Sequence, residues 1–454
     1  MADKELFSEQ DVLDEISRTN RPPKSILWEL KNNIKFNLTI PPTVYPPRED
    51  TKLMGNRILS LGAGRGRKFL EIGCGSGALS ICASYLGWDV FACDINPFAV
   101  AATQGNMEEN RLKGTIVEGG VGPDGFPFNE KFDLIVWNLP YIPASNSEEE
   151  ILGPLEEASF LDNDILGLDQ RMINAIVNNK LLNNHGKILA LSRTEISGRG
   201  LAHRVWDKLT FDDGEELVLT CLWNPWDGAS NNYIEKTGST NSDLLKMEGV
   251  GTHIRAGIQE DARGRKSRKW TSIEGSYAGS WIVSNSPDIN PGFLQICGAL
   301  AVINSIPVPG LNLKWPNDII IDGRKVCGIL AESQSIGDNI NVVLGIGINL
   351  KSSDDDFNFD AAYIDELIPC NAAIIDPIIT AELASLIELR DDLPPINIEV
   401  IKNDALRRIT GYGNPIYKGE EYCDFSLDDS FRLVLGDDTI IDDGETIKWN
   451  TEKS

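Results

Sequence analysis

Five basic residues occupy seven consecutive positions, Arg263 to Lys269, within the stretch QEDARGRKSRKW. The chain of 454 residues has a formal net charge of −26, so this cluster is an isolated positive feature. Arginine presents a rigid fork of donors that matches phosphate and carboxylate groups. The pattern therefore favours one of three roles: a nucleic-acid contact, a solvated loop, or a site for a small phosphate-bearing ligand.

A second group that could do chemistry is the glycine pattern E-x-G-x-G-x-G at 71 to 77. It follows an apolar run and precedes a helix-like segment, and the next apolar run ends at Asp94. Glycines at such a turn let a ligand touch the backbone, and the acid can accept both hydroxyls of a ribose. By itself the pattern is a weak signal, because a tight turn that binds no ligand can have the same glycines.

A third group ends the apolar run FDLIVWNLPYIP, at 138 to 141. A planar NH₂ group is a poor nucleophile, because its lone pair is delocalised. Two acceptors that bind its hydrogens expose that lone pair, and the side-chain oxygen of Asn138 and the carbonyl of Pro140 could serve as these acceptors. Tyr141 offers a flat face against which such a group can stack.

Residues 40 to 225 resemble the amino methyltransferases with an N-P-P-Y motif, and among them the archaeal and eukaryotic glutamine methyltransferases of release factors. The segment VYPPREDT, 44 to 51, is similar to one that precedes the cofactor loop in that branch. The resemblance implies an S-adenosylmethionine site formed by Glu71, Gly73, Gly75, Gly77, Asp94 and Asn138, with Asn138, Pro140 and Tyr141 at the methyl acceptor. Leu139 stands where that branch has proline, which leaves adenine in nucleic acid open as an acceptor beside a release-factor glutamine. A release factor and a small zinc-containing activator subunit are the partners that the resemblance implies.

Four motifs follow in the second half: TGSTN at 237–241, the basic stretch at 259–270, LKWPNDIIIDGRKVCGILAE at 313–332, and VVLGIGINL at 342–350. The third predicts a β-hairpin, because two apolar runs flank an Asp322-Gly323 turn. Lys325 then lies just beyond the turn, and Gly328 leaves room beside it. The fourth motif predicts another buried strand.

Together these motifs resemble those of biotin protein ligases, across about 235 to 450. The resemblance implies that biotin reacts with ATP to form a mixed anhydride, expels pyrophosphate, and passes its acyl group to a lysine of a carrier protein. These reactants are anionic and repel each other, so cations must gather them. That requirement supplies a role for the basic stretch.

The resemblance also implies roles for individual residues. The biotin side comprises Ser239, Thr240, Gln259, Arg263, Lys325 and Gly328. The ATP or adenylate side comprises Arg263, Gly264, Arg265, Arg268, Trp270, Lys314, Asn317 and Asp318. Lys325 is the candidate cation that bridges both reactants, and the catalytic residues are Lys325 and Arg263 in this half and Asn138, Pro140 and Tyr141 in the first.

ATP in this half is not expected to bind to a P-loop, because the chain has no GxxxxGK[ST] sequence. We expect Mg²⁺ only together with ATP. Ala262 and Ser267 stand where the resembled family has glycine. If either position requires a positive φ, we expect backbone strain of roughly 1–2 kcal/mol in the loop.

The elements that position these residues predict an α/β chain. A Rossmann-like methyltransferase sheet is followed by an α+β biotin ligase catalytic domain and a small SH3-like β-barrel. We expect an N-terminal extension at 1–40, the methyltransferase-like domain at 41–228, the ligase domain at 229–408 and the barrel at 409–454. TAELASLIELRDDL, 380 to 393, predicts an amphipathic helix.

Composition limits the remaining choices. The acidic balance argues against stable DNA binding, because counterion release needs a basic face. An acidic, polar start, no apolar run near 18 residues, eight cysteines without a CxxC pair and three separated histidines predict a cytoplasmic protein with no membrane contact and no histidine-based metal site.

The favoured hypothesis is a bifunctional enzyme with both activities, in which the biotin carrier domain of a carboxylase is a partner and the ligase half can form a homodimer. Three alternatives stay open: an active ligase with a catalytically inert docking domain, a methyltransferase whose second half only binds biotin, and a nucleic-acid-binding regulator.

Overall fold

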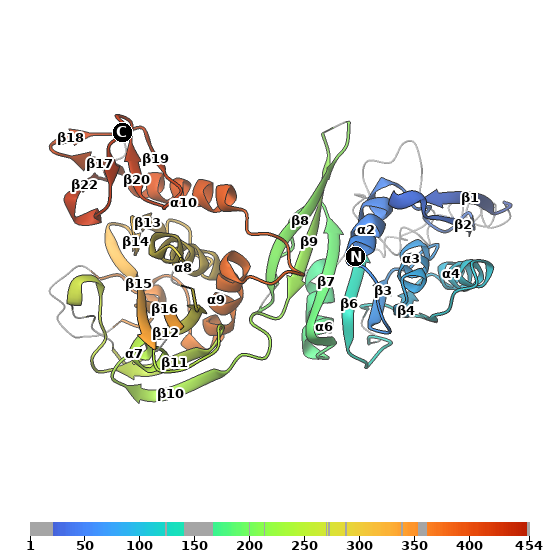
Figure 1. Ribbon diagram of the computed structural model, residues 1–454, viewed down its shortest axis with the longest axis horizontal. Coiled ribbons are helices and arrows are strands. Elements are labelled where there is room, and N and C mark those ends of the chain that lie inside the picture. The colour runs from blue at the N-terminus through green and yellow to red at the C-terminus, as the bar shows by residue number, and fades with distance from the viewer. Residues whose placement is uncertain are drawn as a thin grey trace, which may run out of the picture. The chain divides into compact units, whose positions relative to one another are not determined.

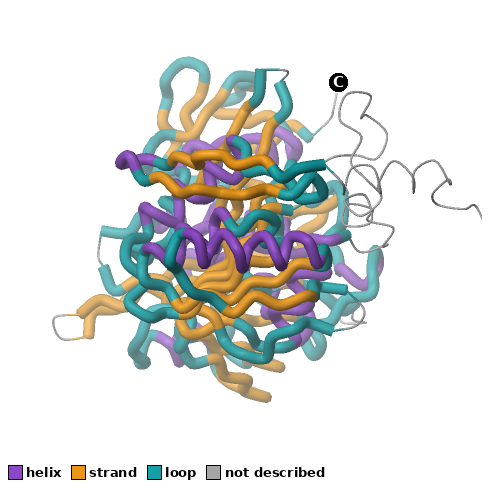
Figure 2. The backbone as a smooth tube through the Cα atoms, turned by 90° about the vertical axis from the view of Figure 1, so that its right-hand side faces the viewer, coloured by secondary structure: helices purple, strands orange, loops and turns teal. Residues whose placement is uncertain are grey.

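The computed structural model describes residues 21–451 except 123–124, 140–166, 199, 213, 269, 271–272, 287, 337–338 and 353–360. Its contacts divide the chain into two compact units. The first comprises Met1–Gly198, His203–Asn224 and Asp392–Pro394, and the second comprises Arg199–Ala202, Pro225–Asp391 and Pro395–Ser454. Helices and strands occur throughout the described chain (Figure 2), and the α/β class is confirmed.

The first unit is built on a seven-stranded sheet in the order β5-β4-β3-β6-β7-β9-β8 (Figure 1). Its strands are β3 (Lys68–Ile72), β4 (Asp89–Asp94), β5 (Thr115–Glu118), β6 (Phe132–Asn138), β7 (Leu182–Ser192), β8 (Ala202–Thr210) and β9 (Glu216–Trp223). Strands β3 to β7 pair in parallel, and β9 is antiparallel to β7. The Rossmann-like sheet expected from the sequence is therefore confirmed.

Helices and a hairpin complete this unit: α2 (Glu49–Ser60), α3 (Ala78–Tyr85), α4 (Pro97–Glu109), α6 (Leu168–Asn178), and the pair β1 (Lys24–Glu29) and β2 (Lys35–Ile40). Asn96 caps α4, with Pro97 as the first helical residue. In the sheet, the strand order reverses beside β3, since β4 and β5 lie on one side of it and β6 and β7 on the other. Open sheets bind ligands at the carboxyl ends of strands at such a point.

The second unit has its own seven-stranded sheet, in the order β10-β11-β12-β16-β15-β14-β13. Its strands are β10 (Asn231–Thr237), β11 (His253–Gln259), β12 (Tyr277–Ser284), β13 (Asn312–Lys314), β14 (Asp318–Ile321), β15 (Arg324–Ile336) and β16 (Asn339–Ile348). Strands β14 and β15 form the predicted hairpin, and β16 is the predicted strand. Its helices are α7 (Thr240–Leu244), α8 (Pro291–Ser305), α9 (Ala372–Ile387) and α10 (Ile398–Tyr412).

The helix expected at 380 to 393 is different in the structure. Helix α9 begins at Ala372 and ends at Ile387, so the polar end of the expected segment is not helical. Much of the helix is buried rather than amphipathic, because apolar residues occur around much of its circumference. The sequence analysis did not predict α10 or β10.

A buried polar network joins α9 to the sheet. Asp376 Oδ1 accepts a hydrogen bond from the Tyr277 hydroxyl at 2.7 Å and lies 2.9 Å from His253 Nε2. Burial by itself raises the pKa of Asp376, but the bonds from His253 and Tyr277 outweigh it, so the pKa lies below its usual value. His253 also stacks on Trp281, with ring centroids 4.3 Å apart, and therefore serves the core of this unit.

The C-terminal segment holds two three-stranded sheets, in the orders β18-β17-β22 and β19-β20-β21. Their strands are β17 (Asn414–Tyr417), β18 (Glu420–Glu421), β19 (Phe425–Leu427), β20 (Leu433–Leu435), β21 (Ile440–Ile441) and β22 (Lys448–Asn450). The short 3-10 helix η4 (Gly444–Thr446) lies between β21 and β22. A small β-rich segment is thus present, while its SH3-like character stays a prediction.

Two candidate active sites

The glycine loop of the first unit connects β3 to α3. Gly73, Gly75 and Gly77 have φ values of 67°, 52° and 79°, which residues with side chains rarely adopt. Asp94, at the end of β4, accepts hydrogen bonds from the backbone N–H groups of Gly75 and Asn96, each at 2.9 Å. Burial raises the pKa of Asp94, and the backbone bonds partly offset this. The acid therefore holds the loop against the end of β4.

Glu71 and Gly77 each make a contact that shapes the glycine loop. The carboxylate of Glu71 accepts a hydrogen bond from the backbone N–H of Ser80 at 2.8 Å, so one of its oxygens is engaged at the start of α3. Burial raises the pKa of Glu71 to about 8. Gly77 does not line the cavity beside the loop; a side chain there would lie 2.8 Å from Thr103. Both residues shape the loop, and their contact with a cofactor stays a prediction.

Asn138 ends β6 beside this loop. Its Nδ2 donates a hydrogen bond of 2.9 Å to Asp50 Oδ2, and its Oδ1 is buried with no hydrogen-bond partner among the described residues. A carboxylate only accepts, so Asp50 fixes which way the amide points. With no partner among the described residues, this oxygen is available there as an acceptor for a donor. Pro140 and Tyr141 lie outside the described residues.

A cavity of about 290 Å³ joins these features. Five of the predicted cofactor residues line it: Glu71, Gly73, Gly75, Asp94 and Asn138. Asp50, Asn96 and Trp137 line it as well, and the sequence analysis gave them no role at a cofactor. A bare glycine loop, an acid at the adjacent strand end and an orphaned amide oxygen fit a nucleoside-bearing methyl donor and an NH₂ acceptor.

The second unit contains a larger cavity of about 890 Å³. All the residues predicted for biotin and ATP line it: Ser239, Thr240, Gln259, Arg263, Gly264, Arg265, Arg268, Trp270, Lys314, Asn317, Asp318, Lys325 and Gly328. They come from α7, β11, the basic loop, β13, β14 and β15, which are far apart in the sequence. The fold therefore brings the four sequence motifs to one hollow.

Lys325 lies at the centre of this arrangement. Its ammonium donates a hydrogen bond of 2.6 Å to Asp318 Oδ1 and lies 5.3 Å from the centre of the Trp270 ring. A side chain at Gly328 would come within 3.0 Å of Trp270 and 3.3 Å of Lys325 Nζ. Gly328 therefore provides the space that the sequence predicted, and the indole occupies part of it.

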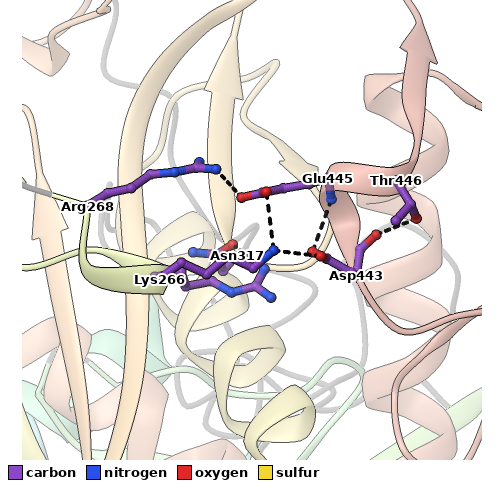
Figure 3. Close-up of polar contacts among 7 residues, drawn as sticks. Lys266, Arg268, Asn317, Asp443, Glu445 and Thr446 are labelled. Atoms are coloured by element: carbon purple, nitrogen blue, oxygen red, sulfur yellow. Dashed lines mark hydrogen bonds and ion pairs between the residues drawn. The ribbon is translucent and has the colours of Figure 1, made fainter.

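The basic loop is held by two acidic residues of the C-terminal segment, Asp443, which caps η4, and Glu445 within η4 (Figure 3). Lys266 Nζ lies 2.6 Å from Asp443 and 3.2 Å from Glu445, and Arg268 also pairs with Glu445. Arg265 donates a hydrogen bond of 3.3 Å to Asn317. Of the cations in this loop, at least these three are tied to neighbouring side chains.

The backbone of the loop bears on one expectation. Among the described residues of the loop, Lys266 has a positive φ, at 54°, and Ala262 does not. Ala262 is buried, and its carbonyl accepts a hydrogen bond from the backbone N–H of Trp270 at 2.9 Å. The condition for strain is therefore not met at Ala262, and the expectation for Ser267 stays a prediction.

Two further residues of this cavity, Asn241 and Ser280, were missed. Asn241 closes the TGSTN motif and Ser280 lies on β12, and both line the cavity. Asn241 follows two residues that were singled out, so its position was available as a signal. Ser280 lies in an apolar strand, and nothing in the sequence marks it.

Two negative observations concern the described residues. They contain no group of three or more His, Cys, Asp or Glu side chains that could hold a metal ion. Among the same residues, no helix combines the length and apolar character needed to cross a membrane.

The folds and cavities define a chain that joins a methyltransferase unit to a biotin ligase unit. Residues 51–143 match the family model of ribosomal protein L11 methyltransferase (PrmA), and residues 233–349 match the biotin/lipoate A/B protein ligase family. The release factor glutamine methyltransferase of Lactococcus lactis is 30% identical over 198 residues, which cover 41% of this chain and 71% of that protein. With that coverage, the first part of the chain belongs to the release factor glutamine methyltransferase family, fused to a biotin/lipoate ligase domain.

Relatives of the second half include the bifunctional ligase/repressor BirA of Bacillus spizizenii, 41% identical over 135 residues, which are 28% of this chain and 41% of that protein. The chain thus spans less than half the length of this relative. Among solved structures, the biotin protein ligase of Aquifex aeolicus in complex with biotin and ATP has 20% identity and a TM-score of 0.40, and the match covers 49% of this chain and 99% of that one.

Proposed function

We propose that the second unit is a biotin–protein ligase that works through biotinyl-AMP. The observation that carries the proposal is the single cavity in which Thr240, Arg263 and Lys325 converge. This cavity supplies hydrogen-bonding groups at one part and several cations at another. The 41% identity to a ligase/repressor over 135 residues supports the same assignment.

In this proposal the carboxylate of biotin attacks the α-phosphorus of ATP, pyrophosphate leaves, and a mixed anhydride forms. A lysine amine of a carrier protein then attacks the acyl carbon and AMP leaves. Lys325 and Arg263 neutralise the carboxylate and phosphate so that two anions can approach each other. Trp270 covers the adenylate and limits its hydrolysis by water.

Mg²⁺ is proposed only as the companion of ATP, with Asp318 and Asn317 near it. Asp318 is paired with Lys325, and a carboxylate between an ammonium and a metal–nucleotide complex can serve both charges. The acceptor is proposed to be the biotin carrier domain of a carboxylase.

Biotin-dependent exchange of pyrophosphate into ATP tests the ligase proposal on the full chain. We expect exchange that requires biotin and Mg²⁺. Exchange that is absent, or that does not depend on biotin, would refute the proposal. A cell extract with labelled biotin should then yield a labelled carrier protein, which identifies the acceptor.

We propose that the first unit transfers a methyl group from S-adenosylmethionine to a planar NH₂ group, with the glutamine of a release factor as the preferred acceptor. The orphaned Oδ1 of Asn138 carries this proposal. It accepts one hydrogen of the NH₂ group, and the Pro140 carbonyl accepts the other, which localises the lone pair on nitrogen. Gly73, Gly75 and Asp94 hold the cofactor through the backbone and the ribose.

Saturable binding of S-adenosylmethionine to the full chain, measured by calorimetry, is the first test. Asp94→Ala should weaken binding at least tenfold, the cost of roughly two hydrogen bonds. Wild-type protein that binds no S-adenosylmethionine would leave the alternative of a catalytically inert docking domain. Methyl transfer to adenine in nucleic acid instead of a glutamine peptide would change the acceptor and keep the reaction class.

A nucleic-acid-binding regulator is disfavoured, because Lys266 and Arg268 are paired with carboxylates and the chain is strongly acidic. The exchange assay also tests the alternative of a methyltransferase whose second half only binds biotin. Biotin-dependent exchange would exclude that alternative. As partners we propose a release factor, a zinc-containing activator subunit and a second copy of this chain bound through the ligase half. The proposed location is the cytoplasm. The proposed domain boundaries are 1–40, 41–228, 229–408 and 409–454.

A further inference from the structure

A chain of hydrogen bonds leads from Glu332, on β15, to the larger cavity. Asn241 Nδ2 donates to Glu332 Oε2 at 2.7 Å, and Ser280 Oγ donates to Asn241 Oδ1 at 2.6 Å. Ser280 Oγ lies 2.7 Å from Thr240 Oγ1. Asn241, Ser280 and Thr240 are at most 5% exposed, so the bonds among these three residues are shielded from water.

The direction of this chain is set at Glu332. A carboxylate only accepts hydrogen bonds, so the amide of Asn241 must turn its Nδ2 toward Glu332 and its Oδ1 toward Ser280. A side chain at Gly345 would lie 2.3 Å from Asn241 Oδ1, so the amide rests against bare backbone. The single hydroxyl hydrogen of Ser280 is thereby used on Asn241.

The hydroxyl hydrogen of Thr240 is used in the same way. It faces two acceptors, Ser280 Oγ at 2.7 Å and Gln259 Oε1 at 3.0 Å. The backbone N–H of Thr240 also donates to Gln259 Oε1 at 2.8 Å, which fixes the orientation of that amide. Neither hydroxyl keeps a hydrogen for a ligand, so at this end of the cavity both can offer only lone pairs.

We propose that Glu332 is a positioning residue that fixes this polarity, so that the cavity selects ligands with N–H donors and rejects those without them. The inference rests on the proposed ligase function, since the ureido ring of biotin carries two N–H groups. Glu332 acts through Asn241 and Ser280 and does not touch the ligand.

A second contact of Glu332 must be separated from this role. Glu332 Oε1 lies 3.6 Å from the guanidinium of Arg263, one of the residues proposed to act on the anionic groups. Removing the charge of Glu332 could therefore also disturb Arg263. The two effects concern different parts of a ligand. Arg263 is proposed to contact the carboxylate or phosphate, whereas the hydrogen-bonded series that ends at Thr240 is proposed to contact the ring.

Calorimetry on the full chain, with biotin and with biotin methylated on both ureido nitrogens, tests the inference. Glu332→Gln lets the Asn241 amide turn over, and we expect it to weaken biotin binding roughly tenfold, the cost of about one hydrogen bond. The variant should bind the methylated ligand as weakly as the wild type does. The ratio of the affinity for biotin to that for the methylated ligand should therefore be smaller in the variant. The KM for ATP in the exchange assay should not change.

Two further variants make the result decisive. Asn241→Ala should weaken biotin binding by a similar factor. The double variant Glu332→Gln, Asn241→Ala should bind biotin no more weakly than either single variant, because both changes break the same series of hydrogen bonds. In an Arg263→Ala background, Glu332→Gln should still weaken biotin binding. A melting temperature within a few degrees of the wild type establishes that each variant is folded.

Several results would overturn the inference. Unchanged biotin binding in Glu332→Gln, equal weakening of both ligands, or an effect that disappears in the Arg263→Ala background would each exclude the proposed role while leaving the ligase proposal intact. A wild-type chain that does not bind biotin would overturn the ligase proposal and this inference together.

Discussion

At the scale of single residues, both sites use a carboxylate to orient a neighbour. Asp50 fixes the amide of Asn138, and Asp318 holds the ammonium of Lys325 at 2.6 Å inside its cavity. In each case the partner is the group proposed to act on the substrate. Orientation by a fixed charge lowers the reorganisation that the reaction needs.

Replacement of Lys325 is the most direct test of the ligase site. Lys325→Ala should reduce biotin-dependent pyrophosphate exchange at least a hundredfold, because the cation proposed to lie between the two anions is lost. Lys236→Ala is the matched control: Lys236 is paired with Glu260 at 2.7 Å and does not line the cavity. Exchange that survives in Lys325→Ala would remove Lys325 from the mechanism.

Replacement of Asp50 tests the methyltransferase site without touching the cofactor loop. Asp50→Asn no longer enforces one orientation of the Asn138 amide, so we expect kcat for methyl transfer to fall roughly tenfold, the value of about one hydrogen bond. Binding of S-adenosylmethionine should stay within about twofold. Asp89→Asn, an exposed change at the opposite end of β4, serves as the control. A fall in cofactor affinity in place of kcat would contradict the proposed role.

Single residues were predictable from the sequence where a local pattern marked them. The glycine loop, Asp94 and the hairpin with Lys325 each combine a turn signal with an adjacent apolar run, and all lie where the sequence indicated. The link from Asn241 to Glu332 spans 91 residues and depends on helix α7 lying against the sheet that contains β15. Such a pair leaves no trace in local spacing, and the same holds for Asp50 and Asn138.

At the scale of elements, the basic loop of the ligase site is held in place by residues outside the loop. Its short 3-10 helix η2 (Arg265–Ser267) contains a left-handed residue, and its cations are matched by the acids of η4. An ATP polyphosphate would compete with these carboxylates for the same cations. The sequence predicted the cations of the loop but not their partners, which lie about 177 residues away.

The contact between loop and η4 can be measured by proteolysis. The double variant Asp443→Asn, Glu445→Gln should be cleaved by trypsin at 263 to 269 several times faster, since the ion pairs that restrain the loop are lost. Asp442→Asn is the control, because Asp442 pairs with Arg432. ATP should slow cleavage in both proteins. Equal cleavage of wild type and double variant would mean that these pairs do not restrain the loop.

The network between α9 and the sheet gives a prediction for stability against pH. Asp376→Asn should lower the free energy of unfolding by roughly 1–3 kcal/mol near neutral pH, because the bonds to His253 and Tyr277 lose their charged partner. The pKa of Asp376 is below its ordinary value of 3.8, so this stabilisation is present above that pH and disappears as the pH falls through the lower native value. Denaturant unfolding at several pH values should find the two proteins converging in acid. A constant difference would contradict the assignment.

At the scale of the whole chain, each unit has its own sheet and its own cavity, and no described residue lines both cavities. The first unit nevertheless includes Asp392–Pro394, which comes from beyond most of the ligase sequence. The ammonium of Lys187, on β7, lies 2.5 Å from Asp392 and is only 7% exposed. The guanidinium of Arg204 donates to the carbonyl of Pro394 at 2.7 Å.

This crossing of the chain predicts how the first unit responds to Asp392→Ala. The change leaves the buried Lys187 with one partner fewer, and we expect a loss of roughly 1–2 kcal/mol in the stability of that unit. Thermal unfolding followed with and without S-adenosylmethionine should assign the shift to the transition that this ligand stabilises. Asp391→Ala is the neighbouring control. A shift confined to the transition that biotin stabilises would contradict the prediction.

The return of residues 392 to 394 to the first unit also orders events during synthesis. When the ribosome has completed residue 224, β3 to β9 are all available, yet Lys187 and Arg204 still lack the partners that arrive about 170 residues later. At the usual pace of translation that gap lasts on the order of ten seconds or more. The nascent methyltransferase unit must therefore wait for most of the ligase sequence before its final hydrogen bonds can close.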